Sequence, residues 1–182
     1  MKNLPQHLTL KAKSIKKLLA SVGCLVILTS FIFCQSVKAM NIEVQLQQLS
    51  EHWAHTNFEL NGESQENAFV ELIGQVEMLT FNYPMQADAW AWSGIIKSTF
   101  AQVSSSLSAL SYIKAAKKDF EHAIELNSNA LTGAAYSNLG MLYHKAPIWP
   151  IAFGDDDIAE ALLKQALVSS PDNKLNNFFY AQ

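Results

Sequence analysis

Apolar residues recur every three to four positions along most of the chain after residue 40, which is the spacing of helices that bury one face. Strand-like alternation is scarce, and the whole sequence has only five Pro and seven Gly. The pattern therefore predicts an all-α fold. Helices are expected over residues 41–60, 65–81, 86–103, 109–127, 130–145 and 156–169, followed by a short helix from about residue 174.

Residues typical of turns separate the predicted helices. Asn61-Gly62 can end the first helix and Ser64 can cap the second, while Pro84 follows the end of the second. Gly154 precedes three carboxylates, Asp155 to Asp157, which suit the unpaired amides at the start of a helix. The loops are short, so neighbouring helices are expected to run antiparallel.

Two of the predicted helix pairs share a pattern of aromatic, small and leucine positions. The two glycines of the pattern, Gly94 and Gly140, are 46 residues apart. Small residues let two helices approach closely, and the larger positions fill the remaining space. The clearer copy consists of Tyr136, Leu139, Gly140, Tyr143, Ala159, Leu163, Ala166 and Pro171. The weaker copy consists of Trp90, Ser93, Gly94, Ala116, Phe120 and Ala123.

Most of the chain from residue 41 to residue 182 resembles a tetratricopeptide repeat (TPR) protein, specifically a small exported bacterial one. The resemblance is carried by these positions and by the segments 92–99, 135–140 and 149–155. The spacing of the copies exceeds the standard 34 residues. The resemblance implies a short right-handed solenoid of about three antiparallel helix pairs, the last one cut short. It also implies a concave face that holds a peptide or protein, without catalysis. A looser similarity to the T component of TRAP-type transporters implies solute handling instead.

Residues 1–39 have the features of a secretory signal peptide. They carry six lysines and no acidic residue, and the stretch from Leu18 to Phe33 is apolar. Small residues at Val37 and Ala39 suit cleavage after Ala39, which predicts an exported, periplasmic domain of residues 40–182 that is free of the membrane. The alternative is an uncleaved anchor, because the 16 residues of this stretch fall just short of the about 18 to 20 apolar residues that span a bilayer core. An anchored chain would suit an envelope assembly factor.

Charge and cysteine content narrow the function of the segment after residue 39. It keeps seven lysines and no arginine against 16 acidic residues, a formal charge of −9 with His neutral. Such a domain is a poor ligand for nucleic acid, whose binding depends on Lys and Arg neutralising phosphates. Both cysteines, Cys24 and Cys34, lie within the predicted signal, so no disulfide is expected after export.

The apolar, proline-containing segment from Ala146 to Gly154 is the first candidate for partner binding. Trp149 and Phe153 lie in it, and burial of a large side chain such as Trp149 contributes about 2 to 3 kcal/mol. Two arrangements follow: the segment folds back as a plug over its own helix pair, or it forms one wall of a groove. A T-component-like accessory would need an enclosed apolar pocket beside Trp149 and Phe153.

Four further side chains are candidates for the same groove. Tyr143, Tyr112 and Trp92 lie on helices that are expected to face it, although aromatic residues at helical spacing also pack cores. Lys97 stands alone among apolar residues, so it can pair with a partner's carboxylate or extend to solvent.

The sequence contains no arrangement typical of catalysis or of a cofactor. It has neither a nucleophile beside a base nor a phosphate-binding glycine loop. His52 and His55 share a helix face but lack further ligands, and Asp155 to Asp157 lack the spacing of a calcium loop. We therefore expect no enzyme, metal or cofactor, and instead a non-catalytic adaptor for a protein or peptide. A small apolar solute is the alternative ligand.

Overall fold

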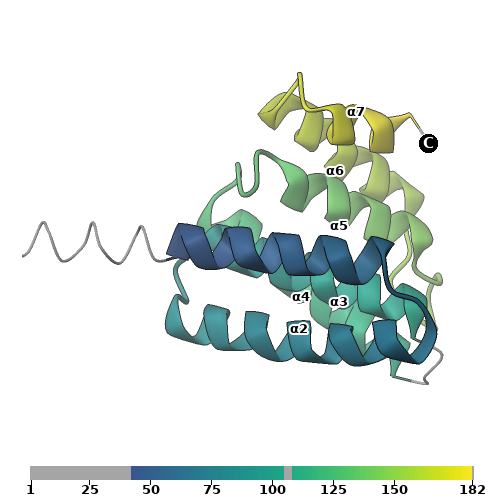
Figure 1. Cartoon of the computed structure of the whole chain (residues 1–182). Coiled ribbons are helices and arrows are strands. Elements are labelled where there is room, and N and C mark those ends of the chain that lie inside the picture. The colour runs from purple at the N-terminus through teal and green to yellow at the C-terminus, as the bar shows by residue number, and fades with distance from the viewer. Residues whose placement is uncertain (1–41, 105–107, 182) are drawn as a thin grey trace, which may run out of the picture. The chain divides into compact units, whose positions relative to one another are not determined.

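In the computed structural model of the protein, residues 42–104 and 108–181 are described (Figure 1), and they form seven helices. The first covers residues 42–58. The others are α2 (Gly62–Asn82), α3 (Ala87–Val103), α4 (Ala109–Leu126), α5 (Ala134–Lys145), α6 (Asp156–Ser169) and α7 (Lys174–Tyr180). This confirms the all-α prediction.

The predicted signal peptide and the alternative anchor, Leu18 to Phe33, lie outside the described residues. Within the part of the chain that is described, no helix has the length and apolar character needed to cross a membrane.

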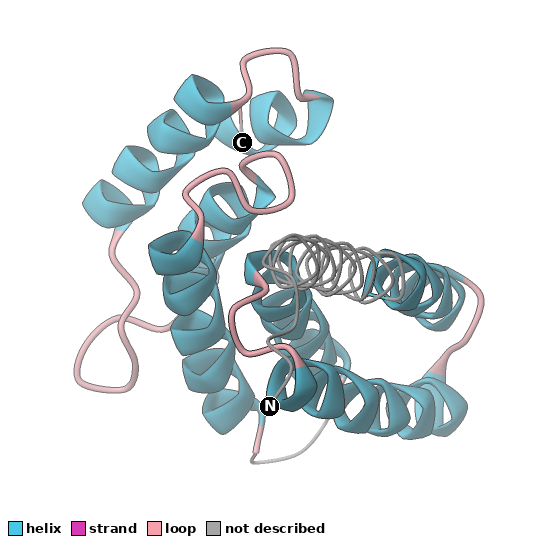
Figure 2. Ribbon diagram, turned by 90° about the vertical axis from the view of Figure 1, so that its left-hand side faces the viewer, coloured by secondary structure: helices cyan, strands magenta, loops and turns pink. Residues whose placement is uncertain are grey.

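The helices pack as consecutive antiparallel pairs. Residues 46–182 form one compact unit, in which α3 with α4 and α5 with α6 are the most extensively packed pairs. The helix before α2 packs on α3 through Trp53 and Trp92, and α2 also packs on α3. At the other end α7 rests on α5 and α6 (Figure 2). Each helix therefore contacts mainly its neighbours along the chain, as expected of stacked helix pairs.

Glycines at the two predicted positions lie directly against a residue of the partner helix. A Cβ atom on Gly94 would lie 2.6 Å from the ring of Phe120 on α4. One on Gly140 would lie 2.9 Å from Cγ of Leu163 on α6. Phe120 and Leu163 are both buried in the core. The two pairs thus use the same device: a large residue of the second helix occupies the space that the glycine of the first leaves open.

Two of the predicted helix starts were wrong. Helix α2 begins at Gly62, and Ser64 does not cap it, because the Ser64 hydroxyl donates to the carbonyl oxygen of Asn61 instead. Helix α5 begins four residues later than predicted, at Ala134. Leu131, Thr132 and Gly133 precede it with left-handed φ angles of 48°, 54° and 79°, which a right-handed helix excludes.

The start of α6 confirms the predicted cap. The carboxylate of Asp155 accepts a hydrogen bond of 3.0 Å from the amide of Ile158, and Asp156 and Asp157 occupy the first turn. Carboxylates here satisfy unpaired amides and face the positive end of the helix dipole. Helix capping therefore accounts for this acidic run.

Candidate functional site

A groove of about 620 Å³ runs along one side of the helix stack. Alternate helices supply most of its lining: the helix before α2, then α3, α5, and α7 with its N-cap residue Asn173. The lining residues are Trp53, Asn57, Trp92, Ile95, Ser98, Thr99, Gln102, Ile113, Leu131, Ala134, Asn138, Met141, Leu142, Lys145, Ala146, Asn173, Leu175 and Phe179.

Helices α3 and α5 present the same positions to the groove, counted from their glycines. Two residues before the glycine stand Trp92 on α3 and Asn138 on α5. Ile95 and Met141 each follow the glycine of their helix by one residue, and Thr99 and Lys145 follow it by five. The two members of each pair are 46 residues apart, like the glycines. Each glycine faces the partner helix, so these positions face away from it. The equivalence shows that the two pairs lie in matching orientations.

An aromatic pair forms one part of the groove. The rings of Trp53 and Trp92 meet edge to face with centroids 5.7 Å apart, and Nε1 of Trp53 donates to the hydroxyl of Thr99 at 3.4 Å. Aromatic pairs of this kind hold their rings in fixed positions while leaving part of their apolar surface accessible. This part of the groove is suited to a ligand's apolar group.

Amide side chains give the groove its polar character. Asn57, Gln102, Asn138 and Asn173 all line it, and Nδ2 of Asn138 is held by the Ala134 carbonyl oxygen at 2.8 Å. Among the described lining residues, Lys145 is the only charged one, and none is acidic. The segment after residue 39 has a formal charge of −9 with His neutral. A groove without acidic lining therefore repels a ligand's carboxylates less than an acidic surface would.

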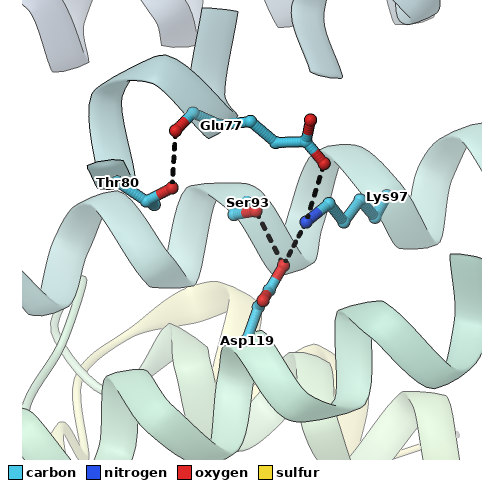
Figure 3. A network of polar contacts seen from close by, with 5 residues as sticks. All are labelled: Glu77, Thr80, Ser93, Lys97 and Asp119. Carbon is cyan, nitrogen blue, oxygen red and sulfur yellow. Dashed lines mark hydrogen bonds and ion pairs between the residues drawn. The ribbon is translucent and has the colours of Figure 1, made fainter. Parts of the chain in front are cut away.

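Lys97 is neither exposed to solvent nor available to a partner, contrary to both arrangements considered from the sequence. It is buried between helices, with Nζ 2.8 Å from Oδ2 of Asp119 on α4 and 3.5 Å from Oε1 of Glu77 on α2 (Figure 3). The hydroxyl of Ser93 donates to the same Asp119 oxygen at 2.7 Å. A buried charge needs a partner, and Asp119 is buried with it. The network joins three helices.

Two of the aromatic candidates pack away from the groove. The ring of Tyr143 meets that of Phe153 at 5.1 Å, and Nζ of Lys117 on α4 lies 5.6 Å from both ring centroids. Burial opposes the charged form of Lys117, but hydrogen bonds with Glu121 and Tyr143 outweigh it and raise the pKa of that ammonium group. Tyr112 packs edge to face on Phe100 at 4.9 Å. Of the six candidate residues, Trp92 lies in the groove.

The segment between α5 and α6 divides into a packed base and an exposed tip. Phe153 packs into the core cluster around Phe120, whereas Trp149 is 81% exposed. Ile148 and Ile151 beside it are exposed too. Neither Trp149 nor Phe153 is among the groove's lining residues. Trp149 is therefore neither a buried plug nor a wall of this groove.

His52, His55 and His144 each pair with one neighbour in the structure. Nδ1 of His55 lies 2.9 Å from Glu59, and Nδ1 of His144 lies 2.7 Å from Asp156. His52 contacts Gln75. Within the described residues, no group of three or more His, Cys, Asp or Glu side chains is placed to hold a metal ion.

Sequence reasoning missed most of the groove, including Trp53, Asn138 and Lys145. The signal that finds Asn138 and Lys145 is their register with Trp92 and Thr99 across the 46-residue repeat.

Comparison with known proteins adds no relative: no model of a protein family matches the chain, and no curated protein does.

Proposed function

We propose that this protein is an exported, TPR-like adaptor whose groove holds an extended segment of a partner protein, and that it catalyses no reaction. The observation that supports the proposal is the shared register of α3 and α5 along the groove. A repeated set of lining positions suits a ligand that is itself repetitive, and a polypeptide backbone is such a ligand.

The chemistry of the lining also fits a peptide. Amide side chains such as Asn57, Gln102 and Asn138 both donate and accept hydrogen bonds, as backbone groups do. Trp53 and Trp92 offer an apolar contact for one side chain, and Lys145 offers a cation for a carboxylate. We therefore propose a peptide segment that combines an apolar residue with an acidic residue or a free C-terminus.

Site-specific photo-crosslinking in the native envelope tests this proposal. A photoreactive amino acid at Gln102 or Lys145 is expected to form an adduct with another polypeptide, because both line the groove. The same amino acid at Glu125, an exposed position on α4, serves as the control. Asn138→Trp, which adds bulk without charge, should fill the groove and lower the yield at position 102 by about tenfold, the effect of 1.4 kcal/mol in binding. Equal adducts from all three positions would contradict the proposal.

A solute-binding accessory, like the T component of a TRAP-type transporter, is the second candidate. Its solute would have to bind in the groove and not in the apolar pocket expected beside Trp149 and Phe153, because neither residue lines the groove and Trp149 is exposed. The groove's volume falls within the range of small-molecule sites, about 300 to 1,000 Å³. Native mass spectrometry of protein isolated gently from its envelope separates the two functions. Extra mass of a few hundred daltons that Asn138→Trp removes would favour a solute, whereas a co-purifying polypeptide would favour the adaptor.

A further inference from the structure

Helix α2 carries an apolar stripe on the face opposite its buried one. Val70, Met78 and Phe81 are 56%, 67% and 84% exposed, and Gly74 lies between them. These four residues, called the α2 stripe below, follow one another at intervals of three or four and so share one side of the helix. The opposite side is buried through Phe69, Leu72, Ile73, Val76, Leu79 and Thr80.

The position of α2 makes this stripe unusual. Helix α2 lies at one end of the stack, where it packs on α3 (Figure 1). The end helices of stacked repeats normally have polar outer faces, because no further repeat covers them. A Cβ atom on Gly74 would meet no atom within 4 Å, so another helix can approach there closely. The α2 stripe has the shape and composition of a face that another helix covers.

Charge identifies the kind of helix that fits. Helix α2 contains Glu63, Glu66, Glu71 and Glu77 and no Lys or Arg. At 100° per residue, Glu71 borders one edge of the stripe, while Glu66 and Glu77 border the other, where Glu77 already pairs with Lys97. A second copy of this chain would bring acidic rows together and repel. Lysines or arginines beside an apolar seam would instead be attracted to this acidic helix, above all along the edge that Glu71 forms.

We propose that the α2 stripe is a docking site for a basic amphipathic helix of another protein, separate from the groove. The apolar seam of that helix would pack on Val70, Met78 and Phe81 across Gly74, and its flanking cations would face the glutamates. This inference does not depend on the function proposed for the groove, since none of the stripe's residues lines the groove.

A defined peptide pair tests the proposal. The probe is a fluorescent helical peptide of about 18 residues, or five turns, with a leucine seam flanked by lysines; the control replaces every lysine with glutamate. Fluorescence anisotropy is measured at physiological salt with the protein isolated from the envelope. We expect the lysine peptide to bind at least about tenfold more tightly than the glutamate peptide, a difference of 1.4 kcal/mol.

Matched variants locate the binding. Met78→Ser with Phe81→Ser should weaken binding of the lysine peptide by about tenfold or more, whereas Val168→Ser, which changes an exposed apolar residue of α6, should not. Glu71→Lys should weaken it severalfold, while Glu125→Lys, an equal charge change on α4, should have little effect. All five positions are exposed, and circular dichroism verifies that each variant folds.

Three results of the binding assay would overturn the proposal: equal binding of the two peptides, unchanged binding of the lysine peptide by the Met78→Ser, Phe81→Ser variant, or an equal loss of binding with the control variants. A photoreactive group at position 81 tests whether a different segment occupies the α2 stripe. If it crosslinks the protein to a second copy of itself or to residues 1–41 of its own chain, the stripe has a different occupant and the proposal is wrong.

Discussion

At Gly140, the absence of a side chain determines how closely α5 approaches α6. Besides Leu163, an added Cβ would meet the carbonyl oxygen of Ala159 at 3.1 Å, and a backbone atom in a helix cannot move aside alone. Gly94 holds the equivalent place between α3 and α4. The close packing of both pairs therefore depends on one residue in each.

Replacing Gly140 tests that dependence. We expect Gly140→Leu to lower the free energy of unfolding by about 2 to 3 kcal/mol, because the added atoms force the helices apart. Gly74→Leu is the matched control: it lies in a helix with open space around it, and it should leave stability equal or raise it by up to about 1 kcal/mol. Urea unfolding followed by circular dichroism measures both. If Gly140→Leu unfolds like the parent protein, the repeat assignment is wrong.

Single residues show where sequence reasoning succeeds and where it stops. The close approaches of Gly94 and Gly140 followed from their spacing and from the residues around them. The role of Lys97 did not, because its partner Asp119 lies 22 positions later on another helix. Its burial becomes predictable only after Gly94 is paired with Phe120, the residue next to Asp119. The loop around Trp149 shows a different limit: its apolar composition does not tell that Phe153 reaches the core and Trp149 does not.

At the scale of elements, the helices were predicted better than the contacts between them. Hydrophobic periodicity located the first six, since each buries apolar residues. The short α7 was also placed from the sequence, although its only buried residue is Asn176. The main error in their ends, the late start of α5, comes from three consecutive left-handed residues, two of which are not glycine. Predicting the groove would have required knowing which helices lie next to one another along one side of the stack. That information lies in the stacking of pairs and is absent from any single helix.

The buried ion pair of Lys97 and Asp119 should stabilise the packing of α3 on α4, and removing one partner alone should be destabilising. Lys97→Met leaves the Asp119 carboxylate buried without its cation and should cost about 3 to 5 kcal/mol of stability. Adding Asp119→Leu should recover most of that loss, because the site then becomes apolar. Thermal and urea unfolding of the double-mutant cycle gives the comparison. Lys164→Met, which breaks an exposed pair with Glu160, is the control and should change little.

For the whole molecule, we expect export to leave a domain without cysteine. Cleavage after Ala39 would remove Cys24 and Cys34, so the protein recovered from the envelope should begin at Met40 and show no reactive thiol. N-terminal sequencing, intact mass and a thiol assay measure this. Recovery of a chain that retains residues 18–33 in the membrane fraction would instead support the anchored assembly factor. Without disulfides, stability after export rests on the helix packing alone.

The edge-to-face contact of Trp53 and Trp92 also gives the molecule an optical reporter. Indole emission depends on the polarity around the ring, so a ligand that displaces water from the groove should shift their emission to shorter wavelength. Trp90 and Trp149, which do not line the groove, add background emission. An aqueous quencher such as iodide should suppress Trp149 first, because it is 81% exposed, and Trp90→Phe removes the other contribution. Occupancy of the groove can then be followed in the unlabelled protein, before its partner is identified.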